Sequence, residues 1–280
     1  MSRRITAALA AVAALAACQG PTTGQRPSSS SQSTLIRSVN VGVGTDIPGL
    51  AVLNADTHER RGFDVDLYRW LGNNTEPKFA PVEVDVLIAD RVNALALGRV
   101  QMVVHTFSIT DERRGKIGFA GPYLISQQGF LVREGDETSI RSLDDLAGKT
   151  VCSQAGSTSF NQLTTGALRG KVTTTSELGT RQCVDRLLRK EVDAASTDEI
   201  VLRGFAAQNP QLKVVDLTFG AQERYGVGLP KGDRESCERI TQGIKDFITN
   251  GGWDQFFRSN FGDLSPEGHK PDPNRLDPCP

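Results

Sequence analysis

This sequence has almost no excess of charge of one sign, only three histidines and few long apolar runs. The 280 residues carry 32 Lys and Arg against 33 Asp and Glu, which gives a formal net charge of −1. No overall field therefore favours nucleic acid or an anionic membrane surface, and we expect no nucleic-acid partner. Only the first 17 residues form a long apolar stretch, which excludes a protein with several membrane spans. Hydrophobic residues still reach 38 %, enough for real cores in a chain of this length.

Ligands for a metal ion are also few. The three histidines, His58, His105 and His269, have no partner at the i+3 or i+4 spacing of a metal site. No pair of cysteines has C-x-x-C spacing. We therefore expect neither a metal site nor a cofactor.

Enzyme motifs are incomplete or missing. Ala147–Thr150 is similar to the end of a phosphate loop whose first glycine is absent, and the glycine pattern that begins at Gly42 lacks its third glycine. No G-x-S-x-G or H-E-x-x-H motif occurs. We interpret Asp64 and Asp66 as a solvated first turn of a helix, because side chains two residues apart on a helix do not face each other. No catalytic residue is predicted.

What the sequence does contain begins with an export signal. Arg3 and Arg4 precede an apolar run over residues 5–17, which is too short to span a bilayer and fits a signal peptide over residues 1–17. Leu15 to Cys18 resembles the lipobox of bacterial lipoproteins, in which the cysteine is acylated; an ordinary export signal is the alternative. We expect Cys18 to anchor the protein by a lipid to the outer face of the cytoplasmic membrane. Residues 18–38 are rich in Ser, Thr, Gly, Pro and Gln and predict a flexible tether.

The cysteines agree with an oxidising compartment. Without Cys18 there are four, Cys152, Cys183, Cys237 and Cys279, and four cysteines allow three pairings. We favour Cys152–Cys183, because both fall in one predicted block of strands and helices. We favour Cys237–Cys279 because both fall in the C-terminal region.

Strand and helix patterns alternate along the chain, which predicts an α/β fold with parallel strands. Two apolar segments, 130–132 and 225–229, flank the second half of this pattern, so two lobes joined by two crossing strands are the simplest arrangement. The predicted strands are 38–44, 82–88, 102–107, 149–153, 192–195 and 212–216, and the main predicted helices are 63–71, 90–98, 159–168, 181–189, 198–208 and 235–250. After the last helix, Trp253, Phe256, Phe257 and Phe261 are expected to pack on the first lobe.

Six short motifs recur in one order and spacing over about residues 40–262. They resemble those of the family 3 extracellular solute-binding proteins, which feed polar amino acids to ABC importers. The motifs are RGFDVDL at 61–67, SITDER at 108–113, FAGPY at 119–123, VCSQAGSTS at 151–159, VDAASTD at 192–198 and YGVG at 225–228. The chain is most similar to the glutamate-binding branch of Gram-positive actinobacteria, which also places cysteines like Cys152 and Cys183.

The resemblance implies the two-lobed, type 2 periplasmic-binding-protein fold. The first lobe is expected to hold residues 39–129 and 226–280 and the second 133–222, with hinges near 130–132 and 223–225. It also implies a lipid-anchored monomer that takes up a free amino acid between the lobes and delivers it to the permease of an ABC importer. A sensor that signals to a membrane receptor, and a dehydratase that shares this fold, are the alternatives.

The same resemblance assigns the groups that hold the ligand's zwitterion. Arg113 matches the family's arginine for the α-carboxylate, since a guanidinium donates two parallel hydrogen bonds to a carboxylate. Asp198 matches the aspartate that receives the α-ammonium, although a plain helix cap is the alternative. Hydroxyl and backbone contacts to the ligand are expected from Thr106, Ser108, Ser157 and Thr158.

Specificity for the side chain is expected to come from Arg91. It lies seven residues before Gly98, where acidic-amino-acid binders that resemble this chain have an arginine for the distal carboxylate; an outward surface arginine is the alternative. Gly44 stands where that branch often has a lysine, so we expect it to leave room but no second cation. Asp46, Gln154 and Thr197 are further ligand candidates, and His105 is expected to be packed. Glutamate is the favoured ligand, followed by aspartate or glutamine.

Overall fold

A computed structural model describes residues 38–279 of the chain. The predicted signal peptide, Cys18 and nearly all of the tether lie outside the described residues. Within them, every helix is too short or too polar to cross a bilayer.

The largest element is a mixed sheet in which two parallel groups of strands flank an antiparallel pair. Its order is β5-β1-β6-β12-β7-β10-β8-β9, and β11 also pairs with β7. The strands are β1 (Ser38–Val43), β5 (Ala80–Asp85), β6 (Met102–Val103), β7 (Gly118–Arg133), β8 (Thr150–Gln154), β9 (Thr173–Glu177), β10 (Ala194–Asp198), β11 (Leu212–Val214) and β12 (Phe219–Leu229). β1 pairs in parallel with β5 and β6, and β8 pairs in parallel with β9 and β10. The predicted parallel α/β pattern is therefore confirmed in both groups.

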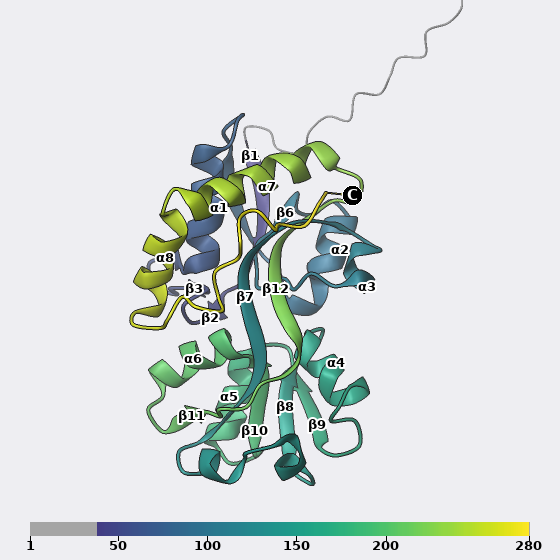
Figure 1. The fold of residues 1–280 in the computed structure, drawn as a ribbon, viewed down its shortest axis with the longest axis vertical. Coiled ribbons are helices and arrows are strands. Elements are labelled where there is room, and N and C mark those ends of the chain that lie inside the picture. Colours follow the sequence, from purple (N-terminus) through teal and green to yellow (C-terminus); the bar gives the residue numbers. More distant parts are fainter. Residues whose placement is uncertain (1–37, 280) are drawn as a thin grey trace, which may run out of the picture. The chain divides into compact units, whose positions relative to one another are not determined.

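The long strands β7 and β12 join the two groups. They pair with each other antiparallel, while β12 also reaches β6 and β7 also reaches β10 (Figure 1). This matches the expected pair of crossing strands. We use the predicted limits as names: the first lobe is 39–129 with 226–280, and the second lobe is 133–222.

Each predicted helix is present, with ends that shift by no more than three residues. The helices are α1 (Phe63–Asn74), α2 (Arg91–Ala96), α3 (Asp111–Arg114), α4 (Thr158–Thr165), α5 (Thr180–Leu188), α6 (Glu199–Gln208), α7 (Arg234–Thr249) and α8 (Gly252–Phe261), with 3₁₀ turns η1 (Ile88–Asp90), η2 (Asp136–Ser139) and η3 (Leu143–Leu146). The aromatic cluster after α7 packs on the first lobe as expected, because Phe63 of α1 contacts Phe247, Trp253, Phe257 and Phe261.

Some local structure escaped the sequence patterns. The predicted strand over 102–107 ends at Val103, and the residues that follow are a loop. A three-stranded sheet of β2 (Asp46–Ile47), β3 (Ala51–Leu53) and β4 (Arg60–Arg61) was not predicted, because two or three residues are too few to show alternation. β9 was also missed, since its sequence is TTTSE and offers no apolar face.

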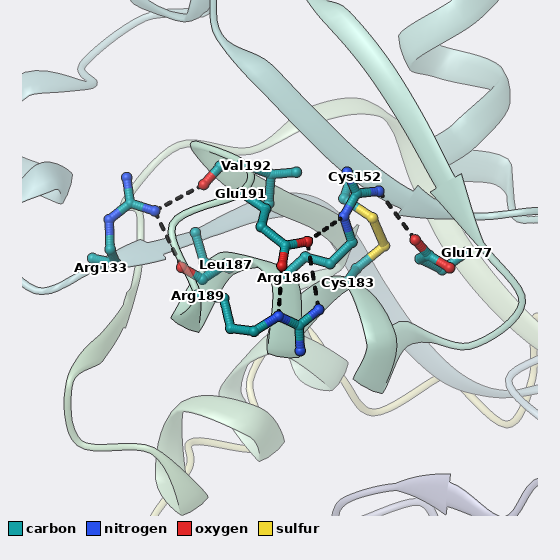
Figure 2. Close-up of polar contacts among 9 residues, drawn as sticks. All are labelled: Arg133, Cys152, Glu177, Cys183, Arg186, Leu187, Arg189, Glu191 and Val192. Carbon is teal, nitrogen blue, oxygen red and sulfur yellow. Dashed lines mark hydrogen bonds and ion pairs between the residues drawn. A yellow bond between two sulfur atoms is a disulfide. The ribbon is translucent and has the colours of Figure 1, made fainter.

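Both favoured disulfides are present. Cys152 of β8 is joined to Cys183 of α5, and both side chains are buried. Beside this bond Arg186 pairs with Glu177 at 3.0 Å and with Glu191 at 3.3 Å (Figure 2). Cys237 of α7 is joined to Cys279, which ties the irregular C-terminal segment to the first lobe.

Candidate functional site

A narrow cavity lies where the two lobes face each other, and most of the predicted ligand residues line it. Its polar lining combines one guanidinium, one carboxylate and several hydroxyls, and three aliphatic side chains complete the wall. The lining residues are Ile47, Ile88, Arg91, Thr106 and Ser108 from the first lobe, with Ser157, Thr158, Thr180, Thr197, Asp198 and Val201 from the second. A roomier hollow beside α6 and α8 is open to solvent, and its Arg203 already pairs with Glu199.

Arg91 opens α2 and turns inward. Its side chain is only 2 % exposed, which excludes the outward surface arginine. Nε donates to the carbonyl of Ile88 at 2.9 Å, and Nη1 donates to the carbonyls of His105 and Thr106 at 2.8 and 2.7 Å. These bonds fix the guanidinium at the cavity wall, and among the described residues Nη2 has no hydrogen-bond partner. The two N–H donors of Nη2 are thus available to a ligand.

Arg113 lies beside the cavity and reaches from one lobe to the other. It sits on the short helix α3, whose first turn is capped by Thr110. Nη1 donates to the carbonyl of Ser108 at 2.8 Å, and Nη2 donates to the carbonyl of Gly156 in the second lobe at 3.1 Å. Gly156 has φ +77°, and a Cβ there would lie 2.6 Å from the Cα of Ala89. A glycine is therefore needed for this loop to approach the first lobe so closely.

Asp198 ends β10 and presents an unsatisfied oxygen. The hydroxyl of Tyr225 donates to Oδ2, whereas Oδ1 is buried and has no hydrogen-bond partner within residues 38–279. Burial raises the pKa of this carboxyl well above its usual range, and the nearby Glu223 raises it further. Asp198 precedes α6 but makes no side-chain cap bond, so a capping role does not explain it. A buried, unpaired carboxylate oxygen suits an ammonium group.

The start of α4 supplies the hydroxyls of the second lobe. Ser157 is its cap and accepts a hydrogen bond from the amide of Phe160 at 3.0 Å. Thr158 follows and lines the cavity, as does Thr197 at the end of β10. Because the first amides of a helix lack partners within it, this end of α4 is suited to a carboxylate beside Arg113.

Besides Arg113, which lies beside the cavity, two other predicted ligand residues are absent from its lining. Gln154 donates to the carbonyl of Leu178 at 2.8 Å and accepts from the hydroxyl of Thr180 at 2.8 Å, so it stands behind Thr180. Asp46 lies in β2 and is half-buried, and burial raises the pKa of its carboxyl. The structure thus gives Gln154 the task of orienting Thr180 and leaves Asp46 apart from the other ligand candidates.

The interpretation of Asp64 as a solvated residue is wrong. Its carboxyl is fully buried, accepts from the amide of Thr106 at 3.0 Å and from the hydroxyl of Tyr123 at 2.7 Å, and burial raises its pKa to about 7. Asp66, by contrast, is half-buried and bonds Asn260 at 2.7 Å. The RGFDVDL motif therefore supports the cavity through Asp64, which fixes the backbone of a lining residue.

The expectation that Gly44 leaves room is also wrong. A Cβ at Gly44 would lie 2.5 Å from Nε2 of His105, so the imidazole already fills that space. His105 is buried as expected, does not line the cavity, and has a pKa lowered to about 3 by burial and by the charge of Arg91. A side chain at position 44 and this histidine exclude each other.

Several functional residues were not predicted. Thr180, Ile47, Ile88 and Val201 line the cavity, and the ring of Phe107 lies 4.3 Å from the Arg91 guanidinium carbon. Thr180 is the first residue of α5, directly after Gly179 at the cap position, and nothing in the local sequence marks its hydroxyl as a ligand contact. The aliphatic residues look like ordinary core positions, so nothing in their local sequence marks them as ligand contacts.

Comparison with known proteins agrees with this arrangement. The sequence matches the bacterial extracellular solute-binding proteins, family 3, over residues 39–263. The chain belongs to this family. The glutamate-binding protein GluB of Corynebacterium efficiens is 32 % identical over 246 residues, which cover 82 % of this chain and 81 % of GluB. The glutamine-binding protein of Geobacillus stearothermophilus is 30 % identical over 203 residues, 72 % of this chain and 76 % of that protein.

Solved structures of family members confirm the two-lobed fold. An ancestral arginine-binding protein bound to arginine has a TM-score of 0.75 and 28 % identity, and the match covers 81 % of this chain and 100 % of that chain. An ancestral arginine-binding protein bound to glutamine has a TM-score of 0.72 and 28 % identity, and the match covers 82 % of this chain and 100 % of that chain. The fold is thus that of a solute-binding protein of the periplasmic-binding type.

Proposed function

We propose that this protein captures a free acidic amino acid, glutamate before aspartate or glutamine, outside the cytoplasmic membrane and delivers it to an ABC importer. The observation that carries the proposal is a pair of arginines, one buried and one half-buried, that form no ion pair among the described residues, although the Asp198 carboxyl is near enough to act on the charge of both. Arg91 and Arg113 both lie over the ring of Phe107, at 4.3 and 5.1 Å, and neither forms an ion pair with a carboxylate in the described part of the chain.

Two unpaired guanidinium groups favour a ligand with two carboxylates. Burial lowers the pKa of both arginines, and the charge of Arg113 lowers that of Arg91 further, so an anion in the cavity would relieve both. The α-carboxylate would meet Arg113 and the start of α4, and the distal carboxylate would meet Nη2 of Arg91. Asp198 Oδ1 would accept from the α-ammonium. Glu223 lies nearby but is bonded to Gln128 and does not line the cavity.

The relatives support an amino-acid ligand and lean toward glutamate. GluB is named as a glutamate-binding protein, and the relative from Geobacillus stearothermophilus as a glutamine-binding protein. Glutamate and glutamine share a shape and differ at the distal group, which is where Arg91 would act. Gly44 stands where the glutamate-binding branch often has a lysine, so this chain lacks a second cation there. We therefore expect the preference for the acid to depend on Arg91 alone.

The dehydratase alternative needs a proton donor in the cavity. His105 is a buried histidine next to the lining residue Thr106. With a pKa of about 3 it carries no imidazolium proton near neutral pH, and it lies outside the lining. Asp198 does line the cavity and its pKa is raised, so a measurement of turnover has to decide between binding and catalysis. A sensor would use the same cavity, and we propose transport because the family consists of solute-binding proteins of importers.

We also propose that Cys18 carries the lipid that keeps the protein at the membrane. Support comes from the lipobox-like residues 15–18 after a short apolar run. Mass spectrometry of the exported protein should find an acylated Cys18 at the new amino terminus. Cys18→Ala should release unacylated or unprocessed protein, and an unmodified amino terminus elsewhere in the native protein contradicts the anchor.

Calorimetry with the twenty amino acids tests the ligand. Glutamate should bind most tightly, with glutamine and aspartate next, and basic or aromatic amino acids should bind far more weakly. A preference for a basic or aromatic amino acid overturns the assignment of Arg91, and the absence of any binding overturns the proposed function. Incubation with prephenate-like acids provides the enzyme control, because turnover there would establish a dehydratase instead.

A further inference from the structure

The C-terminal segment, residues 265–279, runs along β7 to the back of the proposed ligand site. The amide of Ile125 donates to the carbonyl of His269 at 2.9 Å, and the amide of Asp277 donates to the carbonyl of Gly121 at 2.7 Å (Figure 1). Two residues later, Cys279 is bonded to Cys237 of α7. The segment has no helix or strand of its own, so these contacts fix its course.

Asp277 forms ion pairs with two arginines. Its Oδ2 accepts from Nη2 of Arg114 and its Oδ1 accepts from Nη2 of Arg224. The aspartate side chain is 14 % exposed, and those of the arginines are 30 % and 35 % exposed. Two arginines that share one partly buried carboxylate form a stronger contact than an isolated ion pair on the surface.

Each of these arginines is the chain neighbour of a group at the site. Arg114 follows Arg113 on α3, which has four residues and so little rigidity of its own. Arg224 precedes Tyr225, whose hydroxyl holds Asp198. The backbone links the same two segments, because the amide of Ile109 donates to the carbonyl of Arg224 at 2.8 Å.

We propose that Asp277 is a positioning residue for ligand binding, which holds Arg113 and Tyr225 in place through Arg114 and Arg224, and that the Cys237–Cys279 bond keeps Asp277 there. This inference rests on the proposed function for its effect on affinity, but the restraint on α3 is a property of the free protein. The C-terminal segment would thus position both the arginine for the α-carboxylate and the tyrosine that holds Asp198, without contacting the ligand.

The first test uses Asp277→Asn in the full chain without ligand. Hydrogen exchange should become faster at the amides of Arg114, Gly115 and Ile117, which are bonded within α3 and its following turn. Exchange in β8 and α5 should stay as in the wild type. Asp272→Asn is the matched control, because Asp272 is exposed in the same segment, accepts a hydrogen bond from the amide of Asn274, and has no arginine partner among residues 38–279. Unchanged exchange at α3 in Asp277→Asn overturns the proposal.

The second test measures affinity on the folded variants. Asp277→Asn should weaken glutamate and glutamine alike by about tenfold, because the zwitterion contacts are common to both. Asp277→Glu, which keeps two carboxylate oxygens, should recover part of the loss, and the double variant Cys237→Ser with Cys279→Ser should shift affinity in the same direction as Asp277→Asn. A lower melting temperature with unchanged affinity would show a merely structural role and refute positioning. If the wild type binds no amino acid, the proposed function fails while the exchange experiment still decides the restraint.

Discussion

The two arginines over Phe107 make different use of their donors. Arg91 donates three hydrogen bonds to carbonyl groups of its own lobe, and its side chain is almost fully buried. Arg113 is half-buried, and one of its bonds crosses to Gly156 in the other lobe. One guanidinium is therefore a fixed part of the first lobe, whereas the other takes part in the contact between lobes.

This difference suggests separate tasks at the two ends of the site. A group that bonds both lobes is suited to the part of the ligand that every amino acid shares, because binding there favours closure for any ligand. A group that is fixed before the ligand arrives is suited to selection, since it loses little entropy on binding and rejects a side chain that leaves it unpaired. The comparison yields three predictions.

Removal of Arg113 should have the largest effect. Arg113→Ala leaves the α-carboxylate of any amino acid without its partner, at a cost of about 3–5 kcal/mol, which is several hundredfold or more in affinity. Calorimetry should show the loss for glutamate and glutamine equally. Lys116→Ala is the control, because Lys116 is an exposed cation close to α3 that pairs with Glu112. Retained glutamine binding in Arg113→Ala would place the shared carboxylate elsewhere.

Removal of Arg91 should act selectively. Arg91→Ala frees the carbonyls of Ile88, His105 and Thr106, which weakens every ligand to some extent, so the ratio of glutamate to glutamine affinity is the informative quantity. That ratio should fall by about 30- to 150-fold, equivalent to about 2–3 kcal/mol, because only glutamate supplies a distal charge.

Arg99→Ala provides the matched control for Arg91. Arg99 follows α2, is half exposed and pairs with Asp90. It should leave the ratio unchanged. If Arg91→Ala weakens glutamate and glutamine equally, Arg91 only holds the loop at 105–106 in place. It then does not contribute to specificity.

The family resemblance predicted both arginines, together with Asp198, whereas periodicity predicted the helices and strands. Neither could show that Asp64, in an exposed-looking first turn, is buried beneath Thr106, because its partners Thr106 and Tyr123 are 42 and 59 residues away along the chain.

Packing also decided what the pattern left open. Gly44 appeared to leave space, yet His105 occupies it from 61 positions further on, and only the folded backbone brings the two together. Gln154 was expected to contact the ligand, and in the structure it bonds the lining residue Thr180 and is itself absent from the lining. Long-range contacts of this kind have no local signal in one sequence, whereas a capping hydroxyl such as Ser157 does.

The smallest effect should be a dependence of affinity on pH that arises at the Asp198 end of the site. Burial and the nearby Glu223 raise the pKa of Asp198, so in the free protein it takes up a proton at a higher pH than an ordinary aspartate. Only the carboxylate can receive the α-ammonium. Affinity should therefore fall as pH decreases through this raised pKa, by up to about tenfold, or 1.4 kcal/mol, per pH unit. Arg91 and Arg113 add no slope, because arginine stays charged throughout this range.

Glutamine is the suitable ligand for that measurement, since it has no distal carboxyl to titrate. Asp198→Asn should bind weakly and should lose the part of the pH dependence that comes from Asp198. A slope that remains near pH 7 belongs to Asp64, whose pKa is about 7 and whose carboxyl holds the amide of Thr106. Glu223→Gln should move the loss of affinity toward lower pH, because it removes a negative charge that favours the protonated form of Asp198. Glu223 is itself bonded to Gln128 and lies close to Arg113, so its variant also tests whether the two ends are electrostatically independent. If Glu223→Gln changes the glutamate to glutamine ratio as well, the charge at one end reaches the other and the separation of tasks between Arg113 and Arg91 is incomplete.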